Sequence, residues 1–189
     1  MVLNYPVLYR MMDSRSEPTI QQAVATAVAD AESLWAPEKF DGVFPVKGFG
    51  IKRLQPHDLV PIWTAVYNIP NTLSDVWLMS ITTANAWTNV ISQSVMSDSA
   101  YVILTGFFNY DGVPDVDAIK ITADGIEYPV IDIQEMYGWD VATAYFSHPI
   151  IVRPEKMITI AMRARSATQK QFGFLGYTVA KRSYLIGLV

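Results

Sequence analysis

Apolar residues recur every three or four positions over one stretch near the N-terminus, and this spacing predicts one amphipathic helix from Ile20 to Trp35. Thr19 and Gln22 fit a capping box at its start, and Pro37 ends the pattern. The predicted apolar stripe consists of Ile20, Val24, Ala27, Val28, Ala31, Leu34 and Trp35. Alanine is frequent throughout the segment, so we expect this helix to pack closely against a sheet or a neighbouring subunit.

After Phe40 the pattern changes to short apolar runs separated by Gly, Pro, Asn and Asp, which is typical of a β-rich fold. Asp124 and Gly125 separate two of these runs and predict a tight hairpin, because such turns need positive φ angles. The run 157–165 alternates between apolar and polar positions, whereas 101–104 is apolar on both faces. The predicted strands are 44–54, 61–68, 75–83, 86–95, 100–110, 118–123, 126–133, 141–147, 157–165, 172–180 and 184–188.

These elements predict a mainly β protein: an antiparallel two-sheet sandwich of jelly-roll type, preceded by an extended N-terminal arm and one amphipathic helix. We assign residues 1–39 to the arm and helix, and residues 40–189 to the β-sandwich domain. The sequence contains no internal repeat and no Ser/Gly linker that would divide it further.

Composition narrows the class of protein. Of 189 residues, 51% are hydrophobic and 17% charged, which excludes disordered and coiled-coil compositions. The absence of cysteine excludes disulfides and thiolate chemistry. The first residues lack the pattern of a signal peptide, so none is expected, and no continuously apolar stretch is long enough to span a bilayer.

Charge is distributed unevenly along the chain. Residues 1–53 carry six basic and six acidic groups, residues 54–140 one basic and eleven acidic, and residues 141–189 seven basic and one acidic. The two charged blocks could meet between copies of the chain, or could neutralise each other within one fold. In the first case a basic face would meet acidic neighbours, and its candidate residues are Arg163, Arg165, Lys181 and Arg182.

Candidate chemistry is sparse. His57 and His148 lack the spacing of a metal site such as HExxH. Asp111, Asp115 and Asp117 could supply oxygen ligands to calcium, although turn formation and solubility also explain three loop aspartates. In a second group aromatic residues follow two carboxylates, so the group could face a sugar or could cap the core. Its members are Asp132, Glu135, Tyr137 and Trp139.

Other catalytic signals are missing. No serine lies in a Gly-x-Ser-x-Gly elbow, and the basic segment 47–53 has neither the P-loop nor the dinucleotide-binding order. An acidic isoelectric point of about 5.1 argues against dedicated nucleic-acid binding. We therefore expect no catalytic residue and no cofactor.

Large apolar residues exceed what one small sandwich core readily conceals: five Trp, ten Tyr, eight Phe and eight Met. Aromatic residues and methionine with depleted charge are typical of interface cores, so some should lie at contacts between chains. The apolar segment 1–12 could pair with a neighbour as an extended strand. Its candidate contact residues are Tyr5, Tyr9 and Met11.

The chain begins with a short arm and a helix, and residues 40–189 follow as a cysteine-free, aromatic-rich run of strands of jelly-roll length. This arrangement resembles the structural proteins of icosahedral viruses and phages, meaning capsid, cement or penton subunits. The resemblance is architectural. It implies a non-enzymatic, self-assembling subunit without a cofactor, whose partners are copies of itself and other structural proteins. Such a subunit would belong to a virion or other extracellular particle made in the host cytoplasm. The same pattern is similar to lectin-like sandwiches, so carbohydrate binding is the alternative.

Overall fold

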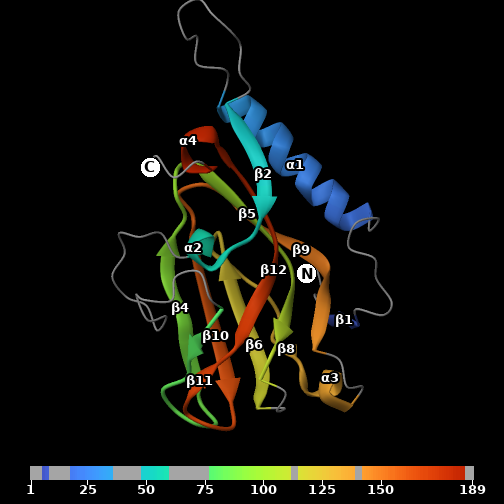
Figure 1. The fold of residues 1–189 in the computed structure, drawn as a ribbon, viewed down its shortest axis with the longest axis vertical. Coiled ribbons are helices and arrows are strands. Elements are labelled where there is room, and N and C mark those ends of the chain that lie inside the picture. The colour runs from blue at the N-terminus through green and yellow to red at the C-terminus, as the bar shows by residue number, and fades with distance from the viewer. Residues whose placement is uncertain are drawn as a thin grey trace, which may run out of the picture.

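The computed structural model describes residues 6–8, 18–35, 48–59, 77–111, 115–138 and 142–185. Two antiparallel sheets face each other across a shared core (Figure 1). In spatial order the first sheet contains β1 (Pro6–Leu8), β9 (Thr143–Val152), β5 (Ala100–Asn109), β12 (Phe172–Lys181) and β2 (Phe49–Arg53). The second contains β4 (Trp87–Val95), β10 (Met157–Ala164), β6 (Val116–Ala123) and β7 (Ile126–Glu127), and β8 (Ile131–Asp132) also pairs with β6. β3 (Met79–Ser80) and β11 (Gln169–Lys170) form a small third sheet.

The predicted class, mainly β with antiparallel sheets and one N-terminal helix, is confirmed. The core between the sheets is aliphatic and aromatic, and it includes Phe107 and Phe172 of the first sheet and Ile121 and Ile160 of the second. The rings of Phe107 and Phe172 stack with centroids 5.6 Å apart. Five aromatic side chains are fully buried within the chain, namely those of Tyr101, Phe107, Phe146, Phe172 and Phe174.

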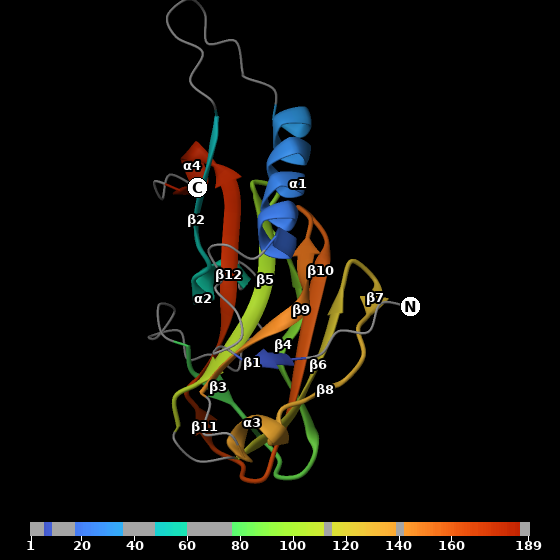
Figure 2. The ribbon, with the colours of Figure 1, turned by 90° about the vertical axis from the view of Figure 1, so that its right-hand side faces the viewer.

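Helix α1 (Pro18–Leu34) covers the outer face of the first sheet (Figure 2). Its buried residues are Ile20, Ala23, Ala27 and Ala31, and the three alanines pack against Tyr101, Ile103 and Val179. Because alanine has a short side chain, the helix lies close to the strands. The predicted stripe was partly wrong, because the helix turns its alanines to the sheet and leaves Leu34 64% exposed.

Strand β5 is buried along its whole length, as predicted for 101–104. Val102 and Leu104 point into the core between the sheets, whereas Tyr101 and Ile103 point toward α1. The alternation predicted for β10 is also confirmed, because Ile158, Ile160, Met162 and Ala164 are buried, whereas Thr159 and Arg163 are only partly buried.

The predicted hairpin at Asp124 and Gly125 joins β6 to β7, with φ angles of 53° and 76°. Several other expectations need correction. The predicted strand 126–133 splits into β7 and β8, with Pro129 between them, and 75–83 shrinks to β3. The segment 184–188 was predicted as a strand, but its first residues belong to a short helix. Short helices that the periodicity did not predict are α2 (Pro56–Leu59), α3 (Gln134–Gly138) and α4 (Arg182–Leu185).

The N-terminal arm pairs within its own chain in the part that is described. Residues Pro6–Leu8 form β1 and pair antiparallel with Ala144–Phe146 of β9 in the same chain. The arm candidates Tyr5, Tyr9 and Met11 lie outside the described residues, as does the predicted strand 61–68. Among the described helices, none has the length and apolar character needed to cross a membrane.

Candidate functional site

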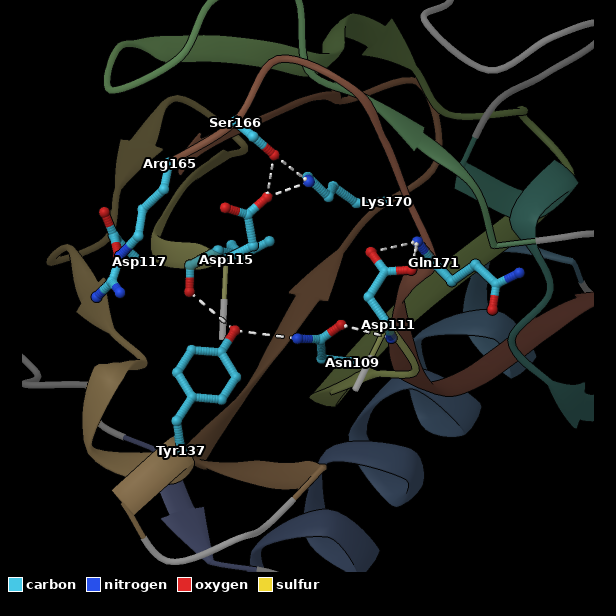
Figure 3. Close-up of polar contacts among 10 residues, drawn as sticks. Asn109, Asp111, Asp115, Asp117, Tyr137, Arg165, Ser166, Lys170 and Gln171 are labelled. Carbon is cyan, nitrogen blue, oxygen red and sulfur yellow. Dashed lines mark hydrogen bonds and ion pairs between the residues drawn. The ribbon is translucent and has the colours of Figure 1, made fainter. Parts of the chain in front are cut away.

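Polar side chains gather at the end of the sandwich where β5 ends, β6 begins and β10 turns toward β11 (Figure 3). We call this group the Asp115 network. It includes the three aspartates that the sequence suggested as calcium candidates and one residue of the sugar-binding candidates, Tyr137, together with residues that the sequence did not single out. Its members are Asn109, Asp111, Asp115, Asp117, Tyr137, Arg165, Ser166, Lys170 and Gln171.

An irregularity in the sheet sets the position of Asp117. Arg163 pairs with Ala118 and Ala164 pairs with Val116, so Asp117 is an extra residue on β6, a β-bulge. Its carboxylate accepts a hydrogen bond from Arg165 Nε at 3.0 Å, and Arg163 Nε lies 4.0 Å away. The bulge therefore aims one acidic side chain at two arginines that lie almost fifty residues further along the chain.

Asp115 is held by a lysine and a serine. Ser166 Oγ donates to Asp115 Oδ2 at 2.6 Å, Lys170 Nζ donates to Ser166 Oγ at 2.7 Å, and Lys170 also forms an ion pair with Asp115 directly. The side chains of Lys170 and Asp115 are 6% and 13% exposed. Burial by itself raises the pKa of Asp115, but hydrogen bonds from Lys170 and Ser166 and the lysine charge outweigh it, so the pKa is lowered.

Tyr137 links this network to the core. Its hydroxyl donates to the carbonyl of Val116 at 2.9 Å and accepts from Asn109 Nδ2 at 3.0 Å. Burial raises the pKa of Tyr137 to about 12, and the negative charges of Asp115 and Asp117 act in the same direction. The two hydrogen bonds lower the pKa, but their influence is smaller. The phenol therefore stays protonated and serves as a neutral bridge between β5 and β6.

The three aspartates considered for calcium are each used differently. Asp111 accepts from the backbone N–H of Gln171 at 3.0 Å, which fits the turn interpretation, whereas Asp115 and Asp117 face cationic side chains. Within the described ranges, no three acidic or histidine side chains are grouped so that they could hold a metal ion. The charges of Asp115 and Asp117 are thus balanced by Lys170 and Arg165.

Two of the residues considered for sugar binding are described, and both use their polar or aromatic groups within the chain. Asp132 Oδ1 accepts from the backbone N–H of Gln134 at 2.9 Å and so caps α3, whereas the ring of Tyr137 packs against the core. Trp139 and the side chain of Glu135 lie outside the described residues.

The candidate basic face is largely paired within the chain. Arg163 and Arg165 face Asp117, and Arg163 also lies over the ring of Trp87. Lys181 Nζ lies 3.9 Å from Asp98, and Arg182 is exposed at the start of α4. With the pair of Lys170 and Asp115, these contacts favour the alternative that the acidic and basic blocks neutralise each other inside one fold.

A second polar group, which we call the Asp58 cluster, was not found from the sequence. Asp58 in α2 has no exposed side-chain surface. Its Oδ2 accepts from Gln55 N and Thr178 Oγ1, and its Oδ1 accepts from Tyr184 OH and Lys52 Nζ, each at 2.9 Å. The four donors occupy the lone-pair positions that a carboxylate offers.

The Asp58 cluster joins β2 and α2 to β12 and α4, and these two pairs of elements are far apart in the sequence. Burial and then the nearby Asp58 carboxylate raise the pKa of Tyr184, so its hydroxyl remains a donor. His57 lies 3.0 Å from Lys52 Nζ through Nε2. The available signal was the proximity of Lys52, His57 and Asp58 in the sequence, because Thr178 and Tyr184 are more than a hundred residues away.

No protein-family model matches this chain, and no curated protein is significantly similar to it.

Proposed function

We propose that the protein is a non-enzymatic structural subunit that assembles, with copies of itself and with other structural proteins, into a larger particle of the virion type, as a capsid or capsid-associated protein. The strand order carries this proposal. Taking β7 and β8 as one strand, the principal strands in chain order are β2, β4, β5, β6, β7/β8, β9, β10 and β12.

In this series the first strand pairs with the last, the second with the seventh, the third with the sixth and the fourth with the fifth. Such nested pairing is the order expected when one long hairpin is wrapped into the two Greek keys of a jelly roll. Viral capsid domains and lectins both use this fold, so the surface must decide between them.

Exposed apolar side chains favour assembly over sugar binding. Ile126 lies in β7, the edge strand of the second sheet, and Val130 lies between β7 and β8. Met157 begins the neighbouring part of β10, where its carbonyl accepts from the backbone N–H of Asp124. The exposed fractions of Ile126, Met157 and Val130 are 58%, 54% and 53%. We call these three residues the edge patch. An apolar edge of this kind fits contact with another subunit, because burial there removes apolar surface from water.

The polar candidates support the same conclusion in a different way. Asp115, Asp117 and Tyr137 direct their oxygen atoms to partners inside the chain. Their observed contacts thus serve to hold turns and strands together. A subunit that must keep its shape within a particle has a use for such fixed contacts.

The proposal is tested by measuring the mass of the full chain in solution, by light scattering and native mass spectrometry over a wide concentration range. We expect assemblies larger than a monomer, which electron microscopy would image. The double variant Ile126→Asp, Met157→Asp should weaken assembly at least about tenfold in concentration, because it places charge in a desolvated contact. Thr168→Asp, which adds charge on the exposed turn after β10 at the other end of that strand, is the matched control. A strict monomer at high concentration and low salt would contradict the proposal.

A further inference from the structure

We propose that Lys170 and Asp115 react with each other to form an intramolecular amide cross-link between the lysine side-chain nitrogen and the aspartate side-chain carbonyl carbon. The geometry in Figure 3 points to it, because a buried amine and a carboxyl group are in direct contact and one serine is hydrogen-bonded to both. The inference concerns the folded subunit itself and does not depend on the proposed assembly.

Both reacting groups are fixed by the backbone around them. Lys170 lies in β11 and pairs with Met79 of β3, and its residue is only 5% exposed. Asp115 is anchored just before β6, since its carbonyl accepts the backbone N–H of Arg165 at 2.8 Å. Holding two reactants in contact raises their effective concentration by orders of magnitude, which allows a reaction that is too slow between free side chains.

Ser166 provides a path for the proton. Its oxygen accepts from Lys170 Nζ at 2.7 Å, and its hydrogen is donated to Asp115 Oδ2 at 2.6 Å. A shift of two protons along this path converts the ammonium and the carboxylate into an amine and a carboxylic acid. The relay is needed because the pKa of Asp115 is lowered and the ion pair is therefore the resting form.

The reaction is a condensation and needs no oxidant or reductant. The nitrogen lone pair of Lys170 attacks Cγ of Asp115, and a C–N bond forms. The C–O bond to the acid hydroxyl then breaks, and this hydroxyl leaves as water with a proton taken from the nitrogen. The products are one neutral amide and one water molecule, so a buried pair of charges is removed.

The cross-link would close the chain between residues 115 and 170, a segment that contains β6, β7, β8, α3, β9 and β10. Closing a loop restricts the unfolded chain more than the folded one and so stabilises the fold, as a disulfide does. The sequence contains no cysteine, so a disulfide cannot serve this purpose here.

The test is the intact mass of the purified full chain under denaturing conditions. We expect a mass about 18 Da below that of the sequence, one water molecule lost. Digestion with trypsin should leave Lys170 uncleaved and yield a branched peptide that joins it to Asp115. The branched peptide is the decisive result. If the side chain of Asp124 formed a succinimide ring with the backbone nitrogen of Gly125, the chain would also lose one water molecule, but no branched peptide would appear.

Two variants test the chemistry. Lys170→Arg keeps the positive charge but lacks a reactive amine, so it should fold and show no branched peptide, and circular dichroism would verify its fold. Ser166→Ala should slow the appearance of the branched peptide after refolding, because the proton path is lost. The full sequence mass in the folded wild type, or a mass loss without a branched peptide, would overturn the proposal. An unchanged rate in Ser166→Ala would overturn the relay.

Discussion

The Asp58 cluster and the Asp115 network both bury carboxylate groups, but they do so to different depths and with different partners. Asp58 has no exposed side-chain surface and accepts from four donors, two on each oxygen. Asp115 and Asp117 keep 13% and 11% exposure, and they face a lysine, a serine and two arginines. A deeper carboxylate has thus acquired a fuller set of donors, because water cannot supply the missing ones.

The two groups also connect different parts of the fold. The Asp58 cluster fastens the short helices α2 and α4 to β2 and β12, whereas the Asp115 network fastens the turns at the end of the sandwich near α3 and β11 (Figure 1). Between them the sheets are held by an apolar core. Polar contacts therefore stabilise the margins, where short elements have little apolar surface to bury.

The largest loss in the free energy of unfolding is expected from Asp58→Ala. The change leaves Thr178, Tyr184 and Lys52 without their common acceptor, and breaking a buried charge pair in this way costs about 3–5 kcal/mol. Urea denaturation would measure the loss. Asp98→Ala is the matched control, because Asp98 is exposed and its ion pair with Lys181 contributes about 1 kcal/mol or less. Equal losses in the two variants would show that the depth of burial does not matter.

A second comparison lies inside the Asp115 network. Lys170→Met removes a buried cation from Asp115 and should cost about 2–4 kcal/mol, in addition to the loss of any cross-link. Arg165→Ala removes a side chain that is 53% exposed, so about 1 kcal/mol or less is expected. Chemical denaturation at neutral pH would measure the loss of unfolding free energy in both variants. A larger loss for Arg165→Ala would reverse the proposed order of importance.

Sequence patterns predicted the long elements of the fold well, because each of them repeats its pattern over many residues. The helix α1, the strands β4, β5, β10 and β12, and the hairpin at Asp124 follow from local periodicity and turn chemistry. The short helices α2 and α4 could not be predicted in this way. Four residues complete barely one helical turn, and their stability comes from the contacts of Asp58 with distant residues.

The candidate site was predicted only in part, for a related reason. The sequence drew attention to Asp115 and Asp117, but only as calcium ligands or as turn residues, because their partners lie about fifty residues away. The opposite charges of the blocks 54–140 and 141–189 were the available signal for these pairs. Which lysine meets which aspartate depends on strand pairing and on the bulge at Asp117, and neither can be derived from charge alone.

Two partly buried tyrosines, one in each polar group, extend the comparison to alkaline pH. Burial raises the pKa of Tyr137 to about 12 and also raises that of Tyr184. A folded-state pKa above the unfolded value gives stability that is present below about pH 10 and is lost as the pH rises through the folded pKa. Tyr137→Phe should therefore lose about 1–2 kcal/mol at pH 8 through its missing hydrogen bonds, and should decline less steeply between pH 10 and 12 than the wild type. Parallel pH curves for variant and wild type would contradict this.

The smallest expected change in the free energy of unfolding concerns Asp124, whose carboxylate has fewer hydrogen-bond donors than that of Asp58. Among the described residues its Oδ1 is buried without a hydrogen-bond partner, and burial raises the pKa of Asp124 against the opposing influence of Arg153 and Lys156. Stability is therefore greatest when the carboxyl is protonated and is lost as the pH rises through the folded-state pKa. Asp124→Asn keeps a residue that tolerates the positive φ of this turn and removes the charge, so it should gain up to about 1 kcal/mol at pH 7. The gain should disappear in acid, where the wild type is protonated. Asp132→Asn, at an exposed helix cap, should show no such gain, and a benefit of Asp124→Asn that persists at pH 3 would mean that the buried charge is not its cause.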